Sequence, residues 1–401
     1  MKMKIGIALL PVLLLSLASC AQKKDKSEED IFRVAPVESG KSLEITGYVE
    51  TKQSVRIPAR LHGLPITSIG RGVFARKELI NVAIPNSVTA IGDFAFAENL
   101  IIVLNMGNSV VDIGDRTFYK NRLTGSVTIP KSVSTIGVEA FAENQLTSVT
   151  IPNNVTSIGE RAFHKNHLTS VNISNGVTSI GTEVFWDNQL TSVTIPNSVI
   201  VIGDWAFQTN HLSSVTIPDS VTIIGAGAFY DNQLTSVTIP NNVVEIGSEA
   251  FANNPLTSLS VASDNTSFVV KDSFLLSKNE KQLLFYFGSA GSVTIPAGVT
   301  IIGPGAFSLK QLTSVTIPDS VLAIGERAFR GSQLSSVTIP NSVTSIGERA
   351  FQDNQLASIT IGTNVDIGNS AFDGNFTSQY SYNFGRRAGT YILRNNYWSR
   401  Q

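Results

Sequence analysis

The chain reads LTSVTIPNNVTSIGERAFHKNH from Leu146 to His167, and the same 22-residue pattern starts again at Leu168. Further repeats start at the same interval at Leu190, Leu212, Leu234 and Leu256, and later at Leu312, Leu334 and Leu356. The phenylalanine of the pattern occurs in thirteen repeats, as Phe74, Phe96, Phe118, Phe141, Phe163, Phe185, Phe207, Phe229, Phe251, Phe307, Phe329, Phe351 and Phe372. A repeat of this length indicates a solenoid, in which each repeat forms one coil that stacks on its neighbours.

Each repeat predicts a single β-strand followed by turns. Residues 146–151 alternate apolar and polar side chains, which favours a half-buried strand, and Pro152 ends it. The glycine represented by Gly159 is present in all thirteen repeats and predicts a tight turn with a positive φ. The Ala-Phe pair at 162–163 predicts a short helical or 3₁₀ turn that buries both side chains. We therefore predict a β-rich solenoid of about thirteen coils, with one parallel strand per coil and short turns or 3₁₀ segments on the other side.

An asparagine stands two residues before the start of most repeats. This column consists of Asn99, Asn121, Asn144, Asn166, Asn188, Asn210, Asn232, Asn254 and Asn354. Because an amide side chain can satisfy backbone groups in the turns of adjacent coils, we interpret the column as structural. Lys310 and Ser332 interrupt it, which predicts a weaker ladder near the carboxyl end.

The repeat is interrupted in three places. Gly125 adds one residue to its repeat, and the repeat glycines Gly247 and Gly303 are 56 residues apart instead of 22, so about 34 residues are inserted. Residues 262–290 read as strands around a turn, which predicts a β-hairpin insertion that bends or divides the solenoid. Residues 376–401 leave the repeat, and aromatic side chains there such as Tyr380, Tyr382, Tyr391 and Trp398 predict a strand-rich cap.

These interruptions define the predicted domains. The N-terminal part of the solenoid occupies residues 41–261, and its C-terminal part occupies residues 291–375. The insertion lies between the two parts, and the cap follows the second.

The first residues predict export. Lys2 and Lys4 precede an apolar run that is too short to span a membrane, which is typical of a secretory signal peptide, here residues 1–19. The tetrad Leu-Ala-Ser-Cys that ends at Cys20 resembles the lipobox of bacterial lipoproteins. The resemblance implies that Cys20 is lipidated and becomes the first residue of the mature chain. The alternative is an ordinary signal peptide with an incidental cysteine. We interpret residues 20–40 as the lipidated cysteine and a flexible tether.

Composition excludes several classes of function. The net charge of −1 and the lack of a basic block argue against a nucleic-acid partner. Cys20 is the only cysteine, so stability outside the cytoplasm depends on packing and not on disulfides. The four histidines have no carboxylate or cysteine partners at a recurring ligand spacing, so we expect no metal and no cofactor. No set of residues supports catalysis, a hydrolase built on the insertion included, and we predict that the protein is not an enzyme.

The repeat resembles the BspA-type leucine-rich repeat, also called the Treponema pallidum type. The Ile-Pro, Ile-Gly and Ala-Phe pairs recur in fixed register over residues 43–375, and these pairs carry the resemblance. Here an asparagine stands where many members have cysteine, and the repeat is 22 instead of 23 residues long. The resemblance implies a bacterial surface or secreted protein of a family in which several members are linked to adhesion to host matrix and to other bacteria.

Two surfaces are candidates for function. The outward side of the strands carries a row of hydroxyls: Ser148 and Thr150, Ser192 and Thr194, Ser214 and Thr216, Ser236 and Thr238, Ser314 and Thr316, Ser336 and Thr338. These residues suit a soluble strand face, and they also suit lectin-like, protein or ice binding. The turn edge carries the second candidate set: Tyr119, His164, Trp186, Trp205 and Tyr230. Large aromatics on neighbouring coils either contact a partner or cover gaps between turns.

Taken with the family resemblance, these surfaces lead to one functional hypothesis. We expect a lipid-anchored protein outside the cytoplasm, at the outer membrane or cell surface of a bacterium. We expect it to mediate protein–protein or cell adhesion by binding host or bacterial macromolecules. The alternative is a structural or assembly component of the bacterial envelope without a host partner.

Overall fold

A computed structural model describes residues 27–289 and 291–401 of the chain. The predicted signal peptide, the lipidation site at Cys20 and the first residues of the predicted tether lie outside the described residues.

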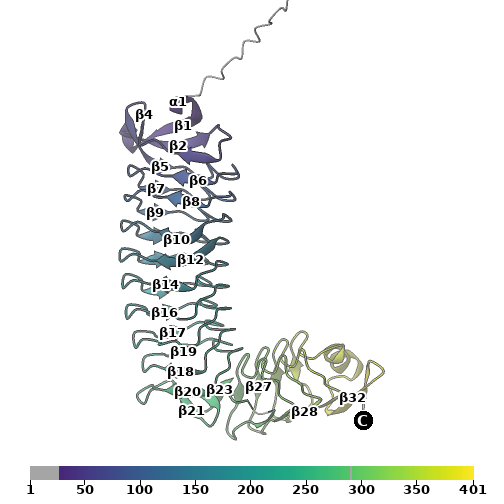
Figure 1. Cartoon of the computed structure of the whole chain (residues 1–401). Coiled ribbons are helices and arrows are strands. Elements are labelled where there is room, and N and C mark those ends of the chain that lie inside the picture. The colour runs from purple at the N-terminus through teal and green to yellow at the C-terminus, as the bar shows by residue number, and fades with distance from the viewer. Residues whose placement is uncertain (1–26, 290) are drawn as a thin grey trace, which may run out of the picture.

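Figure 1 shows two stacks of coils that meet at a bend, a long first arm and a shorter second arm. We define the first arm as residues 27–261, the joint as residues 262–289 and the second arm as residues 291–401. Both arms are solenoids of parallel coils, which confirms the predicted fold class. The structure has about 15 coils instead of thirteen. The two further coils contain β2 (Ser42–Tyr48) and β23 (Gln282–Tyr286). These strands pair with the next coil, but their coils lack the repeat phenylalanine.

Most coils have two short parallel strands, where the sequence predicted one. In a representative coil these are β12 (Gln145–Thr150) and β13 (Ser157–Ile158). The first strand pairs in register with β14 (Ser170–Asn172) of the next coil, so that Val149 lies opposite Val171. Because the second strand is only two residues long, the sequence shows no alternation there that would predict it.

The first strands form one wall of the solenoid. They are β3 (Ser54–Arg56), β6 (Asn81–Ala83), β8 (Val103–Asn105), β10 (Thr124–Thr128), β12, β14, β18 (Ser236–Ile239), β20 (Ser258–Val261), β24 (Ser292–Thr294), β26 (Ser314–Thr316), β28 (Ser336–Thr338) and β30 (Ser358–Ile361). Between β14 and β18 this wall continues only through single bridges that join Asn172, Thr194 and Thr216.

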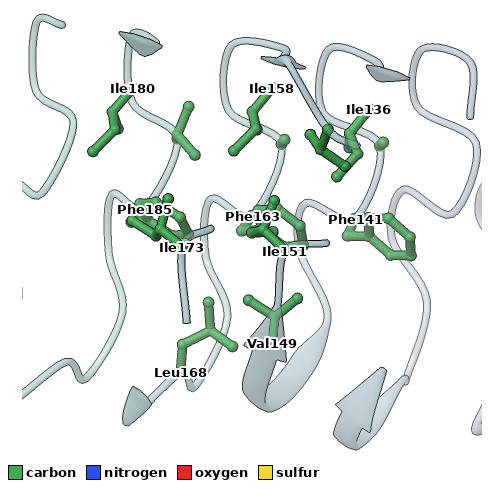
Figure 2. Close-up of a cluster of buried hydrophobic side chains, with 14 of the residues drawn as sticks. Ile136, Phe141, Val149, Ile151, Ile158, Phe163, Leu168, Ile173, Ile180 and Phe185 are labelled. Carbon is green, nitrogen blue, oxygen red and sulfur yellow. The ribbon is translucent and has the colours of Figure 1, made fainter. Parts of the chain in front are cut away.

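Figure 2 shows the core, which lies between this wall and a second wall. The second wall consists of the second strands of the coils. They are β5 (Leu64–Ile69), β7 (Ala90–Ile91), β9 (Asp112–Ile113), β11 (Thr135–Ile136), β13, β15 (Ser179–Ile180), β16 (Val201–Ile202), β17 (Ile223–Ile224), β19 (Glu245–Ile246), β25 (Ile301–Ile302), β27 (Ala323–Ile324), β29 (Ser345–Ile346) and β31 (Asp366–Ile367).

The core consists of columns of identical side chains, one member per coil. Figure 2 shows the column of Ile136, Ile158 and Ile180 above the column of Phe141, Phe163 and Phe185. The phenylalanine rings stack with centroids 4.9–5.9 Å apart from Phe74 to Phe251. In the second arm they stack 4.9–5.0 Å apart from Phe307 to Phe372. Each coil therefore completes the burial of the coil before it.

The repeat glycine is required by close packing between coils, and the prediction of a positive φ at this position is wrong. A Cβ on Gly159 would lie 2.4 Å from the backbone nitrogen of Val138 and 2.5 Å from the carbonyl carbon of Gly137, both in the preceding coil. The positive φ, 57°, falls two residues later at Arg161. The predicted helical turn is a tight turn in which the Ala162 N–H donates to the Gly159 carbonyl at 3.2 Å.

The asparagine column ties neighbouring turns together, as the sequence predicted. Asn166 Oδ1 accepts the N–H of Leu146 at 3.1 Å, and its Nδ2 donates to the carbonyls of Phe141 and Phe163 at 3.0 and 3.2 Å. All eight asparagines of the column in the first arm are buried. Each therefore provides a buried acceptor and donor that the turns on either side would otherwise lack.

An N-terminal cap closes the first arm. It contains α1 (Glu28–Ile31), β1 (Phe32–Val37), the 3₁₀ turn η1 (Glu38–Gly40) and the short strand β4 (Arg60–Leu61). Strand β1 pairs antiparallel with β2, and β2 pairs parallel with β5. The rings of Phe32 and Tyr48 lie 6.4 and 5.0 Å from the first repeat ring, Phe74, and thus cover the open end of the phenylalanine column.

The joint repeats this construction. The insertion, predicted as a β-hairpin, contains three antiparallel strands, β21 (Phe268–Lys271), β22 (Phe274–Ser277) and β23. Strand β23 pairs parallel with β25, as β2 does with β5. The rings of Phe274 and Tyr286 lie 6.3 and 5.4 Å from Phe307, the first repeat ring of the second arm. The joint therefore begins a second solenoid in the way that the N-terminal cap begins the first.

The two faces of the joint serve different arms. Leu275 and Phe285 pack into the hydrophobic core of the first arm, whereas Leu276 and Leu283 pack into the core of the second. Because alternate side chains of a strand point to opposite faces, one small sheet can end one core and start the next.

The C-terminal cap covers the end of the second arm. It consists of α2 (Phe376–Ser378), the π-helical turn η2 (Gln379–Asn383), β32 (Gly389–Arg394) and β33 (Tyr397–Arg400). Strand β32 pairs antiparallel with β30 and so occupies the open edge of the first-strand wall. The cap buries Phe376, Tyr380, Tyr391 and Trp398. Tyr382, in contrast, is 86% exposed.

Candidate functional site

The outward face of the first-strand wall, which we call the strand face, carries the hydroxyl row. Val149 points into the core, so its neighbours Ser148 and Thr150 point outward. Thr194 and Thr316 occupy the same place in other coils and are exposed. The side chains repeat in register from coil to coil because the strands pair residue for residue.

A groove of about 1140 Å³ lies on the strand face over β10, β12 and β14. We call it the strand-face groove. Thr128, Thr150 and Asn172 line its floor, one from each strand. Asn108, Lys131, Asn153, Asn154, Ser174 and Asn175 line it from the adjoining turns. Lys131 is its only charged lining residue, and its other polar side chains are hydroxyls and amides, which both donate and accept hydrogen bonds. Apolar residues, Ile151 and Ile173 among them, line the rest of the groove.

The groove lies where the regular strand pairing of the first-strand wall is interrupted. The extra residue Gly125 has a φ of 66°, and the pairing of β10 with β12 shifts at this point. After Asn172 the strands give way to single bridges. Sequence analysis identified the extra glycine and the hydroxyl row, but a hollow formed by three coils together has no signal in a single repeat.

The turn-edge residues form two pairs and one separate member. The rings of His164 and Trp186 stack with centroids 4.4 Å apart, and those of Trp205 and Tyr230 meet edge to face at 6.0 Å. The structure does not bring Tyr119 to either pair. His164 is buried and the other four are half-buried, so these side chains are less exposed than the sequence predicted.

Two of these residues contact a neighbouring coil, Trp205 through its ring and Tyr119 through its hydroxyl. A Cβ on Gly227 would lie 1.8 Å from Cε3 of Trp205, so the indole rests directly on that glycine. The Tyr119 hydroxyl donates to Glu143 at 2.9 Å. Burial, followed by the charge of Lys165, lowers the pKa of His164. These contacts contribute to packing between turns, whether or not a partner also binds there.

Charge alternates beside the aromatics in a ladder that sequence analysis missed. Arg116 donates to Glu139 at 2.7 Å, and Arg161 donates to Glu183 at 2.7 Å. Arg161 also lies 4.0 Å from Glu139, so the four side chains form a continuous series across four coils. The signal was available, because the residues occupy one position of the repeat with alternating sign. The pairs neutralise the edge locally and offer no unpaired charge for a ligand.

Two further properties bear on the class of protein. Among residues 27–289 and 291–401, no three His, Cys, Asp or Glu side chains are placed to hold a metal ion. Within the same part of the chain, no helix is both long and apolar enough to cross a membrane.

The fold and its surfaces belong to a known class of repeat protein. The family described as BspA type leucine rich repeat region (6 copies) matches residues 63–168, 158–281 and 278–395. Because these segments cover most of the chain, the protein belongs to this family, as the repeat predicted. No curated protein matches the chain.

Solved structures of bacterial leucine-rich repeat proteins share the fold. One from Bacteroides ovatus has a TM-score of 0.55 and 23% identity, over 88% of this chain and 96% of its own. One from Eubacterium ventriosum has a TM-score of 0.50 and 24% identity, over 81% and 93% of the two chains. A leucine rich cell surface protein from Faecalibacterium prausnitzii has a TM-score of 0.49 and 26% identity, over 89% and 96%.

Proposed function

We propose that this protein is anchored by a lipid at Cys20, lies outside the cytoplasm at the outer membrane or cell surface, and binds another macromolecule in adhesion. Proteins of this family commonly mediate protein binding or adhesion, and the family includes cell-surface proteins. The observation that carries the proposal is the strand-face groove, because residues of three neighbouring coils together form a hollow there.

The chemistry of the groove favours a polar, chain-like ligand. Hydroxyl and amide side chains can satisfy both the donors and the acceptors of an extended polypeptide or a glycan. Thr128, Thr150 and Asn172 repeat along the groove with the spacing of parallel strands, about 4.8 Å. A long ligand can therefore make the same contact on successive coils, and weak contacts add up along its length.

The turn edge is a second proposed contact region. Tyr119, Trp186, Trp205 and Tyr230 are half-buried and keep part of each ring accessible to a partner. His164 is buried against Trp186, so we expect it to support that ring and not to touch the partner itself. Aromatic side chains held rigid in this way lose little entropy on binding.

Arginine substitutions at the floor of the strand-face groove test the proposal. We expect Thr150→Arg and Asn172→Arg each to weaken binding of the full chain to fixed host cells or matrix proteins by at least about tenfold, because the longer side chains fill the floor. Thr338→Arg is the matched control, since Thr338 occupies the same exposed position on β28, outside the groove. Equal binding by all three variants and the unchanged protein would rule out the groove as the contact.

The same assay separates adhesion from the alternative of an envelope component. Binding to host cells or matrix supports adhesion, whereas binding only to bacterial envelope preparations supports an assembly role. Anchoring is tested independently with Cys20→Ser. We expect this variant to leave the membrane fraction, and we expect the unchanged protein on intact cells to be cleaved by added protease.

A further inference from the structure

In most repeats of the first arm, the next coil supplies hydrogen-bond partners for the backbone of the first leucine. Leu146 is fully buried. Its N–H donates to Asn166 Oδ1 at 3.1 Å, and its carbonyl accepts the N–H of His167 at 3.0 Å. The segment Asn166-His167-Leu168 of the next coil therefore uses both backbone groups of Leu146, and Leu168 continues the apolar column. We call this three-residue contact a leucine rung.

The last leucine of the second arm lacks its rung. Leu356 would be followed by an equivalent segment, but the chain turns away into α2 at Phe376. Among the described residues, neither the N–H nor the carbonyl of Leu356 has a hydrogen-bond partner. Leu356 is only half-buried, whereas Leu312 and Leu334 in the two preceding coils are fully buried.

A pocket of about 570 Å³ occupies the place of the missing rung. Leu356, Phe372, Leu393 and Trp398 give it an apolar floor, and Asn375 and Asn396 stand at its rim. Both asparagines are exposed, and their side chains make no hydrogen bond within the part of the chain that the structure describes. The size and the apolar floor with a few polar groups are typical of a ligand site.

We propose that this pocket binds a peptide segment of a partner that presents Asn-x-Leu, and so supplies the missing rung. Eight equivalent contacts in the first arm, seven at a leucine and one at Ile101, define the occupant, because an asparagine amide and an apolar side chain two residues later fill this place in each. The Asn of the peptide accepts from the Leu356 N–H, and the next N–H donates to the Leu356 carbonyl. The leucine then covers Leu356 and Phe372.

A folded second copy does not suit this site, because the asparagines and leucines of its rungs are buried, apart from the half-buried Asn354 and Leu356, and the Asn354 amide is already hydrogen-bonded within its own fold. The segment must come from an accessible, extended region of another chain, which is a form of strand addition to an open edge. The pocket lies in the last coil of the second arm, far along the chain from the strand-face groove, and the inference does not rest on the proposed function.

Short peptides test the site on the full chain. The probe is acetylated and amidated Asn-Gln-Leu-Thr-Ser, which is the sequence of residues 354–358 apart from a threonine in place of Ala357. We expect it to bind and to slow deuterium uptake at the Leu356 amide. A peptide with serine in place of leucine should bind at least about tenfold more weakly, because it buries no aliphatic group.

Two protein variants locate the binding. Ala357→Phe places a ring in the pocket and should abolish peptide binding. Ser335→Phe, at the same exposed position one coil earlier, should leave it unchanged. Equal binding of the leucine and serine peptides, retained binding by Ala357→Phe, or no protection of the Leu356 amide at millimolar peptide would each overturn the inference. The peptide comparison stands even if a variant fails to fold.

Discussion

The two arms share one coil geometry but differ in how their turns are tied together. In the first arm, eight buried asparagines form an unbroken column from Asn99 to Asn254. In the second arm Lys310 and Ser332 occupy two of the four positions, and of Asn354 and Asn375 only Asn354 makes the hydrogen bonds of the column among the described residues. The phenylalanine rings stack closely in both arms. The phenylalanine column is therefore sufficient to build the fold. The asparagine column additionally provides hydrogen-bond partners for buried backbone groups in the turns.

The residues that replace asparagine show what the column contributes. Ser332 Oγ is buried and has no hydrogen-bond partner among the described residues. Lys310 leaves the column and lies 4.8 Å from the ring of Phe285, which belongs to the core of the first arm. Ser332 leaves a buried hydroxyl unpaired, and Lys310 holds its ammonium in a half-buried place where desolvation opposes the charge, so both replacements cost stability. We expect the second arm to be the less stable one.

The largest expected effect comes from breaking the column where it is complete. Asn166→Ala removes the acceptor for the Leu146 N–H and the donor for two buried carbonyls. We expect it to lower the free energy of unfolding by about 3–4 kcal/mol. The equivalent Asn354→Ala should cost about half as much, because Asn354 is only part-buried and water can replace its amide. Denaturant unfolding of both variants provides the measurement.

Asn153→Ala is the control for this pair, since Asn153 is exposed in the turn of the same region. It should change stability by less than about 0.5 kcal/mol. Equal losses for Asn166→Ala and Asn354→Ala would show that burial does not distinguish the two arms.

The next largest effect should be a gain in the stability of the second arm when Lys310 is replaced. Burial lowers the pKa of Lys310 to about 8, from 10.5 for the free side chain. The penalty for holding the charged ammonium in the fold is therefore full below about pH 8 and is lost as the pH rises toward 10.5. Lys310→Met keeps a flexible apolar chain against Phe285 and removes the buried charge. We expect it to stabilise the second arm by about 1–3 kcal/mol at pH 7.

The pH dependence distinguishes this cause from improved packing. The unchanged protein should gain stability as the pH rises from 8 to about 10.5, because the penalty disappears once the unfolded lysine is also neutral. Lys310→Met should lack this gain. A variant that is more stable yet keeps the same alkaline gain would exclude Lys310 as the source of the titration.

A smaller repair is available at Ser332. By analogy with Asn354 in the next coil, an asparagine there would accept the N–H of Leu312 and donate to the carbonyl of Phe329, as Asn354 does for Leu334 and Phe351. We expect Ser332→Asn to stabilise the second arm by about 1–2 kcal/mol. Ser332→Ala, which only removes the orphan hydroxyl, should stabilise it less. Hydrogen exchange resolved by arm would detect both changes, and a destabilised Ser332→Asn would show that the turn has no room for the amide.

The sequence predicted the solenoid because every coil repeats the same constraint. The columns represented by Phe163, Ile158 and Asn166 were assigned correctly from spacing alone. The role of Gly159 was not, since conformational freedom and close backbone approach both select glycine, and only coordinates separate them. The two-sided joint was also beyond prediction, because Leu275 and Leu276 are equally apolar while facing different cores.

The candidate surfaces were only partly predictable for a related reason. The hydroxyl row follows from the alternation within one strand, so Thr150 was placed correctly on the outward face. The exposure of a turn residue depends on its neighbour one coil away, which is why His164 proved buried. The strand-face groove and the pocket above Leu356 arise from several coils or from the end of the stack. A repeat pattern describes the interior of a solenoid and carries little information about its irregularities.

The smallest predicted effect is a loss of stability at acid pH, which we expect in the first arm and not in the second. Burial first, and then the positive charge of Lys165, lowers the pKa of His164, while the carboxylates of Glu183, Asp187 and Glu143 oppose this shift. A histidine with a lowered folded pKa contributes its full stability above the unfolded value of 6.5. That contribution is lost as the pH falls below 6.5, because the unfolded chain then binds the proton that the folded protein disfavours.

Acid should therefore loosen the coils around His164 before it affects the second arm, where the described residues include no histidine. Hydrogen exchange at pH 7.5 and pH 5 should show faster exchange around Trp186 and unchanged exchange around Phe329. His164→Phe keeps a ring to stack on Trp186 and should remove the difference between the two pH values. If this variant keeps the acid sensitivity, protonation of His164 is not what loosens the first arm.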